Sequence, residues 1–235
     1  MFRAVVQAST AKNVRSDLAS LAPNLTYHIW SYSHIFIDFF DVSVYIRNRA
    51  LRKMTIIEVL NQFDDQLTKE KVEFNGIVVG ASALVLLGII DRMTRDIDLI
   101  NNSIPQKVRD QIEIFAKKNI GLDSNWINCS SAVLRKNLQP GWESRLREIF
   151  RGKSLRLQTL SRKDLLITKL IGYCDRGTDI YDCIGMKPSQ KELKTSFHWV
   201  RQQDSEKRWP KHVQKCFVEL SRRLNYELSE EDFPL

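Results

Sequence analysis

The stretch from residue 77 to residue 100 constrains the fold of this chain more than any other. It opens with an apolar, β-branched run at 77–79, and such a run predicts a short buried strand. Three small residues at 80–82 interrupt the run, and the apolar segment that follows at 83–90 predicts a helix. The expected order is therefore a buried strand, a tight turn and a buried helix.

A second strand is expected at 96–100, where polar and apolar residues alternate in the order Asp-Ile-Asp-Leu-Ile. Residues two apart on a strand share a face, so Asp96 and Asp98 are expected to point into one site. The two carboxylates then lie about 7 Å apart, at roughly 3.3 Å of rise per residue. Carboxylate oxygens are the ligands that Mg²⁺ or Mn²⁺ takes in proteins, so the pair is a candidate metal site.

The turn before the first helix has the residues of a phosphate cradle. Gly80 lets a backbone approach a phosphate closely, and Ser82 places a hydroxyl near a helix N-terminus, where backbone N–H groups favour anions. Taken alone, a Gly-x-Ser turn after a strand is common, and an Asp-x-Asp pair often lies on a solvated strand edge. Their order and spacing together favour phosphoryl or nucleotidyl transfer.

These residues resemble the signature of the nucleotidyltransferase superfamily that includes DNA polymerase beta. That signature is a Gly-Ser turn, about a dozen residues, and then Asp-x-Asp; Gly80, Ser82, Asp96 and Asp98 match it. The run 92–99 further resembles the R-x-T-x-D-I-D-L form of small bacterial members, the abortive-infection and toxin–antitoxin nucleotidyltransferases. The resemblance implies that an NTP is the substrate, with Mg²⁺ or Mn²⁺ as cofactor.

The same resemblance implies an acceptor and a partner. The acceptor would be a hydroxyl on RNA, such as a tRNA end, or on a protein, and the partner a cognate toxin or antitoxin. The block 166–182 is similar to the L-x-x-K-L…R…D-x-x-D signature of these relatives, which implies that Lys169 faces the nucleotide phosphates. A surface lysine with its stem on apolar residues is the alternative. Arg92 is interpreted as either a phosphate contact or a structural ion pair.

One departure from the superfamily pattern concerns the third carboxylate, which usually comes from a later strand. A third strand is expected at 126–128, and the position for the acid holds Asn128 and Cys129. Asp123 can take the role only if the strand register differs from the one expected. The alternative hypothesis is therefore a catalytically weak or inactive nucleotidyltransferase-fold protein that binds a nucleotide or a partner, as an antitoxin-like subunit does.

Composition narrows the class of partner. The formal net charge of +8 and the pI near 9.3 favour acidic partners such as nucleic acid or nucleotide phosphates. The four cysteines have no metal-ligand spacing with one another or with the four histidines, so they are interpreted as thiols in a reducing compartment. The expected location is the cytoplasm.

The remaining patterns predict helices and one further strand. Thr55, Ser161 and Ser189 are each followed three residues later by an acid, which is typical of a helix N-cap. Residues 155–160 alternate and predict a strand, and Pro210 is expected to open the last helix.

Together these elements predict an α/β (α+β) fold with a small mixed β-sheet. We expect a nucleotidyltransferase core at 54–160 and a helical C-terminal subdomain at 161–235. Residues 1–53 are expected to form an N-terminal extension outside the functional domain, and an ordinary extension packed on that domain is the alternative. The aromatic run at 28–42 is shorter than the roughly 20 residues that a membrane-spanning helix needs, so no membrane partner is expected.

Overall fold

The computed structural model describes residues 55–92, 94, 96–119 and 121–235. Residues 54–235 form one compact unit. The extension expected at 1–53 lies outside the described residues, and the domain boundaries stay predictions.

Two small sets of strands meet in the core. The strands are β1 (Phe74–Val78), β2 (Ile97–Asp98), β3 (Ile127–Asn128), β4 (Arg147–Arg151) and β5 (Leu155–Thr159). β5 lies between β1, to which it is parallel, and β4, to which it is antiparallel, while β2 and β3 pair in parallel. An antiparallel bridge between Val78 and Leu99 joins the two sets. The small mixed sheet that the sequence predicts is confirmed.

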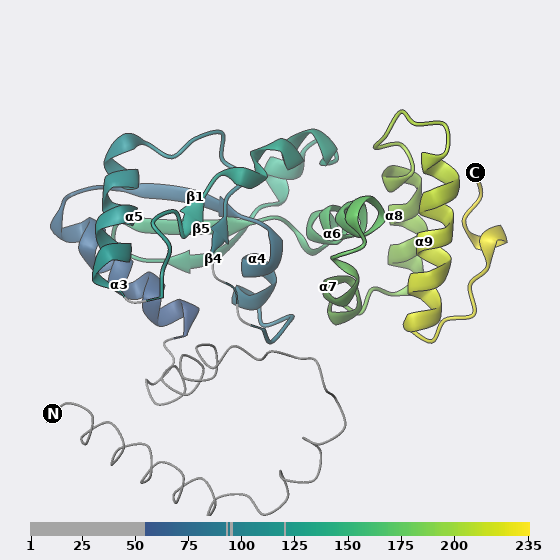
Figure 1. Cartoon of the computed structure of the whole chain (residues 1–235), viewed down its shortest axis with the longest axis horizontal. Helices are drawn as coiled ribbons and strands as arrows, with labels where there is room; N and C mark the ends of the chain where they lie inside the picture. The colour runs from purple at the N-terminus through teal and green to yellow at the C-terminus, as the bar shows by residue number, and fades with distance from the viewer. Residues whose placement is uncertain (1–54, 93, 95, 120) are drawn as a thin grey trace, which may run out of the picture. The chain divides into compact units, whose positions relative to one another are not determined.

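Helices lie at both ends of the strands, and the later helices form a group at the right of Figure 1. They are α3 (Ile56–Lys69), α4 (Gly80–Leu86), α5 (Gln106–Lys118), α6 (Arg162–Arg176), α7 (Ile180–Gly185), α8 (Gln190–Val200) and α9 (Trp209–Arg223). The 3-10 helices are η1 (Ser130–Asn137), η2 (Trp142–Arg145) and η3 (Glu230–Asp232). Together with the sheet, they make the α+β class that the sequence predicts.

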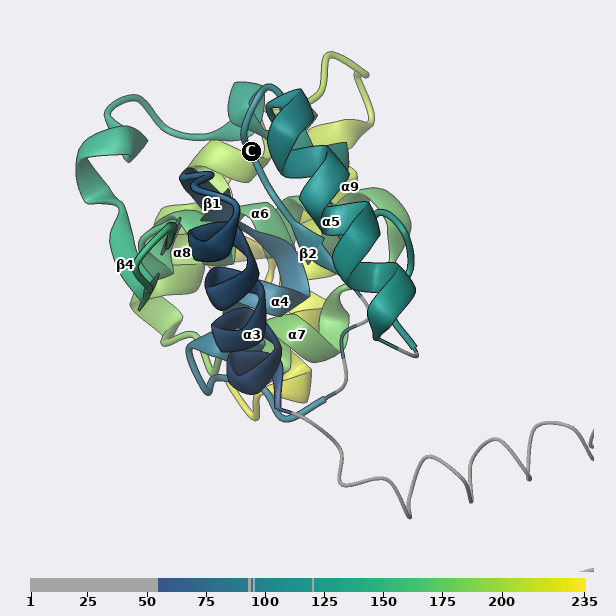
Figure 2. The same cartoon turned by 90° about the vertical axis from the view of Figure 1, so that its left-hand side faces the viewer.

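Helix α3 illustrates how local signals and packing agree. The capping box predicted at Thr55 is confirmed, with the Thr55 hydroxyl accepting from the Glu58 amide and the Glu58 carboxylate accepting from the Thr55 amide. Phe63 on the buried face meets Phe115 of α5 and Trp126 beside β3, with ring centroids 5.3 and 5.2 Å apart. Figure 2 looks along this side of the molecule, with α3 and α5 nearest the viewer.

The C-terminal part is helical, as the sequence predicts. Ser161 and Ser189 cap α6 and α8, each accepting a hydrogen bond from the amide three residues later. Pro210 stands in the first turn of α9, where the missing N–H costs nothing. The rings of Phe197 on α8 and Phe217 on α9 lie 5.4 Å apart, so aromatic contacts join the last two helices.

Three expectations about element boundaries are wrong, and one strand was not expected. The strand expected at 77–79 is Phe74–Val78. The helix expected at 83–90 begins at Gly80, because the positive φ of that glycine (71°) turns the chain directly out of β1. The strand expected at 96–100 is reduced to Ile97–Asp98, so Asp96 precedes it. Strand β4 was not expected, since its mostly exposed Arg-Glu-Ile-Phe-Arg run has no alternating burial.

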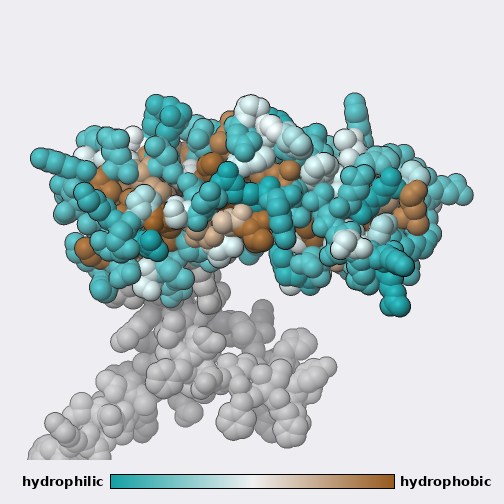
Figure 3. Space-filling model, turned by 90° about the horizontal axis from the view of Figure 1, so that it is seen from above, coloured by the Kyte–Doolittle hydropathy of each residue, from teal (hydrophilic) through white to brown (hydrophobic). Residues whose placement is uncertain are grey.

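The surface seen in Figure 3 is mainly hydrophilic, with hydrophobic residues scattered among polar ones. In the part of the chain that the structure describes, no helix has the length and apolar character needed to cross a membrane.

Candidate functional site

The bridge between β1 and β2 brings the glycine turn beside the acidic pair. The Val79 amide donates to the Asp98 carbonyl at 2.9 Å, and the Ile100 amide donates to the Ile77 carbonyl at the same distance. These bonds hold the end of β1 against β2. The turn at Gly80 therefore lies next to Asp98, although 18 residues of sequence separate the two.

Gly80 is required at this turn by its backbone conformation. Its φ of 71° lies in the left-handed region, which side chains with a Cβ rarely adopt. A Cβ added there would lie 3.4 Å from Oδ2 of Asp98, so the bare backbone borders this carboxylate. Ser82 lies in the first turn of α4, where its buried hydroxyl donates to the Val79 carbonyl at 3.1 Å. Its role at a phosphate stays a prediction.

Asp96 and Asp98 act on one another electrostatically. Desolvation by partial burial, and then the charge of Asp98, raise the pKa of Asp96 above its ordinary value. Asp98 is half-buried and Asp96 is exposed. Among the described residues, neither carboxylate has a cation within ion-pair distance, and every ion pair found there involves another acid. In this part of the chain, the site is thus an acidic pair without a compensating charge.

The strand next to Asp98 supplies no third carboxylate. Asn128 of β3 lies directly across from Asp98 in the parallel register, and its side chain is neutral. The charge of Asp123 contributes to the raised pKa of Asp96, so this acid lies within electrostatic range of the pair. The Trp126 amide donates to the Asp123 carbonyl in the turn that precedes β3, and Asp123 therefore does not share the strand position of Asn128.

Ser130 is a site residue that sequence reasoning missed. Its hydroxyl donates to Oδ1 of Asp98 at 3.0 Å, and its amide donates to the side-chain oxygen of Asn128 at 2.9 Å. The only local signal is the Asn-x-Ser spacing, which suits an Asx turn after a strand. The contact with Asp98, 32 residues earlier in the chain, has no signature in the sequence.

Lys169 and Arg92 meet in one ion-pair network rather than standing free. Lys169 is only 7% exposed, and its ammonium lies 2.8 Å from Asp179 and 2.7 Å from Asp182. Arg92 donates to both oxygens of Asp182, at 3.2 and 3.0 Å. Of the two interpretations of Arg92, the ion pair is therefore present in the structure. Lys169 is buried, so it is not the surface lysine that was the alternative. Their contact with a nucleotide stays a prediction.

Burial and pairing act in opposite directions on this network. Burial raises the pKa of Asp182, but the hydrogen bonds and charges of Lys169 and Arg92 outweigh it and lower that pKa. For Lys169, burial lowers the pKa and the two aspartates raise it, with a net upward shift. Both groups are thus held in their charged forms.

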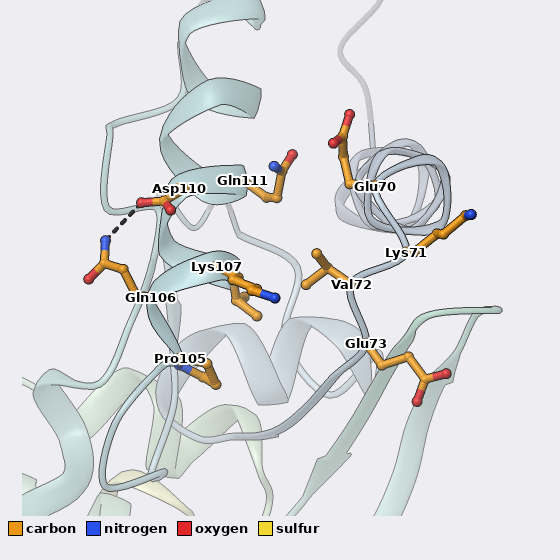
Figure 4. Close-up of a pocket in the computed structure, with 10 residues that line it drawn as sticks. Glu70, Lys71, Val72, Glu73, Pro105, Gln106, Lys107, Asp110 and Gln111 are labelled. Carbon is orange, nitrogen blue, oxygen red and sulfur yellow. Dashed lines mark hydrogen bonds between the residues drawn. The ribbon is translucent and has the colours of Figure 1, made fainter.

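A surface cavity among the described residues lies away from the acidic pair. It has a volume of about 560 Å³ and is bordered by the end of α3 and the start of α5, as Figure 4 shows. Its wall carries both signs of charge, with Glu70 and Lys71 on one side and Lys107 and Asp110 on the other. A second cavity, of about 330 Å³, includes Asn128 in its lining. Neither Asp96 nor Asp98 lines either cavity.

The donor set at Asp96 and Asp98 fits a divalent metal that arrives with a triphosphate. Mg²⁺ is usually bound by one or two carboxylates together with substrate phosphates, rather than by a complete protein cage. In the described residues no group of three or more acids, histidines or cysteines is arranged to hold a metal without such a substrate. The acidic pair is therefore the group that could hold Mg²⁺ or Mn²⁺ here.

Comparison with known proteins places this site in a family. No curated protein and no solved structure matches the chain. A family model matches residues 54–187, which is more than half of the 235 residues, and includes the glycine turn, the acidic pair and the Lys169 network. The chain belongs to this family, DUF6036, a nucleotidyltransferase family of unknown function.

Proposed function

We propose that the protein transfers a nucleoside monophosphate from an NTP to an acceptor hydroxyl in a metal-dependent reaction. The observation that carries the proposal is the acidic pair, Asp96 and Asp98, with the bare backbone of Gly80 against Asp98. Two carboxylates that no described cation offsets favour a metal-ligand role over a structural one. Membership of a nucleotidyltransferase family supports the same chemistry.

Each group at the site has a place in this reaction. Asp96 and Asp98 would hold Mg²⁺ or Mn²⁺, which when bound neutralises triphosphate charge and favours ionisation of the attacking hydroxyl. Gly80 and Ser82 would border the phosphates. The acceptor oxygen attacks the α-phosphorus, and pyrophosphate leaves.

Lys169 and Arg92 contribute to the proposed function by holding the site together and by their charge. Asp182 binds both side chains, so it ties the segment that precedes Asp96 to α6 and α7. The positive charges of Lys169 and Arg92 add to the electrostatic potential that attracts a triphosphate. A direct phosphate contact by Lys169 requires that its ammonium leave one of its two aspartates.

The acceptor we favour is a hydroxyl on RNA, such as a tRNA end, or on a partner protein. The net charge of +8 supports a polyanionic acceptor more than a cationic small molecule. The sequence resembles abortive-infection and toxin–antitoxin nucleotidyltransferases of the DNA polymerase beta superfamily. This resemblance supports a role in a toxin–antitoxin or phage-defence system, with a cognate toxin or antitoxin as partner.

A second candidate function is nucleotide binding without turnover, as in an antitoxin-like subunit. Asn128 favours it, because the residue across from Asp98 is neutral and cannot accept the proton of an acceptor hydroxyl as a carboxylate does.

Transfer from labelled NTPs separates these two functions. Each NTP, labelled at the α-phosphate, is incubated with the full chain, Mg²⁺ or Mn²⁺, and either total RNA or cell lysate. We expect label in one acceptor class with the natural chain, and none with Asp98→Asn. Binding of an NTP without any transferred label would support the second candidate and overturn the first.

A further inference from the structure

Ser130 follows the strand that supplies no third carboxylate to the site. Its hydroxyl donates to Oδ1 of Asp98 at 3.0 Å, and its amide is held by the side-chain oxygen of Asn128 at 2.9 Å. Asn128 is itself paired with Asp98 across the two strands. Ser130 is therefore held by one bond at its backbone and one at its hydroxyl, beside one of the two proposed metal ligands.

The two oxygens of Asp98 have neighbours of different chemistry. Oδ2 borders the Gly80 turn, where a Cβ would lie 3.4 Å away, and Oδ1 accepts from Ser130. One carboxylate thus connects the turn proposed for the phosphates with a hydroxyl. A hydroxyl held by a hydrogen bond beside the phosphate site is a positioned nucleophile.

Ser130 is also reachable from solvent, unlike the other serine of the site. Ser130 is exposed, whereas Ser82 is 1% exposed and donates to a backbone carbonyl within its own helix turn. Among the described residues, Ser130 is the hydroxyl that hydrogen-bonds to Asp98. A serine hydroxyl cannot replace a carboxylate as a base, but its oxygen can accept the transferred nucleoside monophosphate.

We infer that Ser130 is an internal acceptor, so that the protein nucleotidylates itself at this hydroxyl. The inference rests on the proposed function, since it uses the same NTP at the same site. Oγ of Ser130 attacks the α-phosphorus, the Oγ–P bond forms, and the bond from that phosphorus to the bridging oxygen breaks. Pyrophosphate leaves with the electron pair, and the hydroxyl proton passes to water at the exposed Ser130 side chain. The product is a phosphodiester between Ser130 and the nucleoside.

The test looks for this bond in the absence of any other acceptor. The full chain is incubated with each NTP and Mg²⁺ or Mn²⁺, digested with trypsin, and the peptide 119–135 is analysed by fragmentation mass spectrometry. We expect the added mass of one nucleoside monophosphate on Ser130. The adduct should be lost completely in Ser130→Ala and kept in Ser131→Ala, which removes the neighbouring hydroxyl as a matched control.

A conservative variant and a binding measurement complete the test. Ser130→Thr keeps a hydroxyl and should keep the adduct, while an unchanged melting temperature of Ser130→Ala shows that its fold is intact. A natural chain whose melting temperature rises with NTP but whose peptide carries no adduct would overturn the inference and leave the proposed function standing. An adduct of equal yield in Ser130→Ala would overturn it as well. If no NTP raises the melting temperature and none is transferred, both ideas fail.

Discussion

Asp96 and Asp98 are like charges two residues apart, and the described residues supply no cation within ion-pair distance to offset them. Burial and the charge of Asp98 raise the pKa of Asp96. An acid whose pKa is raised by folding opposes folding once the pH exceeds its ordinary value of 3.8. Asp96 therefore opposes folding at neutral pH, which is expected of a group that serves a ligand rather than the fold.

The acidic pair yields a prediction about stability as well as activity. Asp96→Asn and Asp98→Asn each remove one of the repelling charges, so the metal-free variants should unfold at the same or a higher urea concentration than the natural chain at pH 7. Asp110→Asn, a change at an exposed acid of α5, is the control. A loss of about 3–5 kcal/mol in either variant would instead indicate a buried structural ion pair and contradict the metal-site assignment.

Asp182 has the opposite character, because it is a buried acid between two cations. Its side chain is 4% exposed and contacts Lys169 and Arg92. Removing one partner of a buried pair costs about 3–5 kcal/mol, and we expect Asp182→Asn to lose stability of that order in urea unfolding. Asp175→Asn removes an exposed partner of Arg176 and should change stability by less than about 1 kcal/mol. Equal effects of the two changes would show that the network adds little to stability.

The pH dependence of the same network follows from the lowered pKa of Asp182. An acid whose pKa is lowered by folding stabilises the protein above its ordinary value, here 3.8, and this contribution is lost as the pH falls through the lower folded-state pKa. The difference in unfolding free energy between the natural chain and Asp182→Asn should therefore be largest near neutral pH and shrink below pH 3.8. A difference that grows as the pH falls would contradict this sign.

At the scale of elements, one carboxylate joins the first described helix to the β4–β5 hairpin. Asp64 of α3 accepts hydrogen bonds from the amides of Lys153, Ser154 and Leu155 at 2.9, 2.8 and 2.7 Å. Gly152 approaches so closely that a Cβ there would collide with the Asp64 carboxylate. The hairpin turn is thus shaped around a side chain from a distant helix.

This contact predicts a large difference between adjacent aspartates. Asp64→Ala leaves three amides without their acceptor, and hydrogen bonds to charged groups contribute roughly 1.5–3 kcal/mol each, so a loss of at least about 3 kcal/mol is expected. Asp65→Ala, at the exposed neighbour, should stay within about 0.5 kcal/mol of the natural chain. Urea unfolding of both variants checks the prediction, and a stable Asp64→Ala protein would contradict it.

At the scale of the whole molecule, the described residues share one hydrophobic core. The large buried side chains form one cluster that extends from α3 to the C-terminal residues. A chain of residues 54–235 should therefore fold alone, with cooperative unfolding and a near-UV circular dichroism spectrum of packed aromatic residues. A molten spectrum for this chain, beside a packed one for the full chain, would show that the first 53 residues are part of the fold.

Binding of an NTP should stabilise the folded molecule as a whole. A ligand that binds only the native state at about 100 times its Kd adds roughly 2.7 kcal/mol to the free energy of unfolding. We expect each productive NTP with Mg²⁺ or Mn²⁺ to raise the melting temperature, and Asp98→Asn to abolish most of this rise. The absence of any shift at millimolar NTP would contradict both functions considered above.

Much of the fold, and the residues of the candidate site, can be predicted from short-range patterns in the sequence. Helix caps at Thr55, Ser161 and Ser189, and the alternation at 155–160, depend on contacts within a few residues, so they can be seen in the sequence. The glycine turn and the Asp-x-Asp pair are visible for the same reason. Strand β4 was missed because an exposed edge strand has no hydrophobic period to reveal it.

The surroundings of the site depend on the tertiary structure. Ser130 reaches Asp98 across 32 residues, Arg92 reaches Asp182 across 90, and Asp64 reaches Ser154 across 90. No local period encodes such contacts, because they form only when packing of separate elements brings the side chains together. The sequence by itself predicted a glycine turn after one strand and an Asp-x-Asp pair at the next, because both patterns are local. Only the tertiary structure brought Gly80 and Ser130 against Asp98, through the pairing of β1, β2 and β3, and paired Lys169 with Asp179 and Asp182, through the packing of α6 and α7.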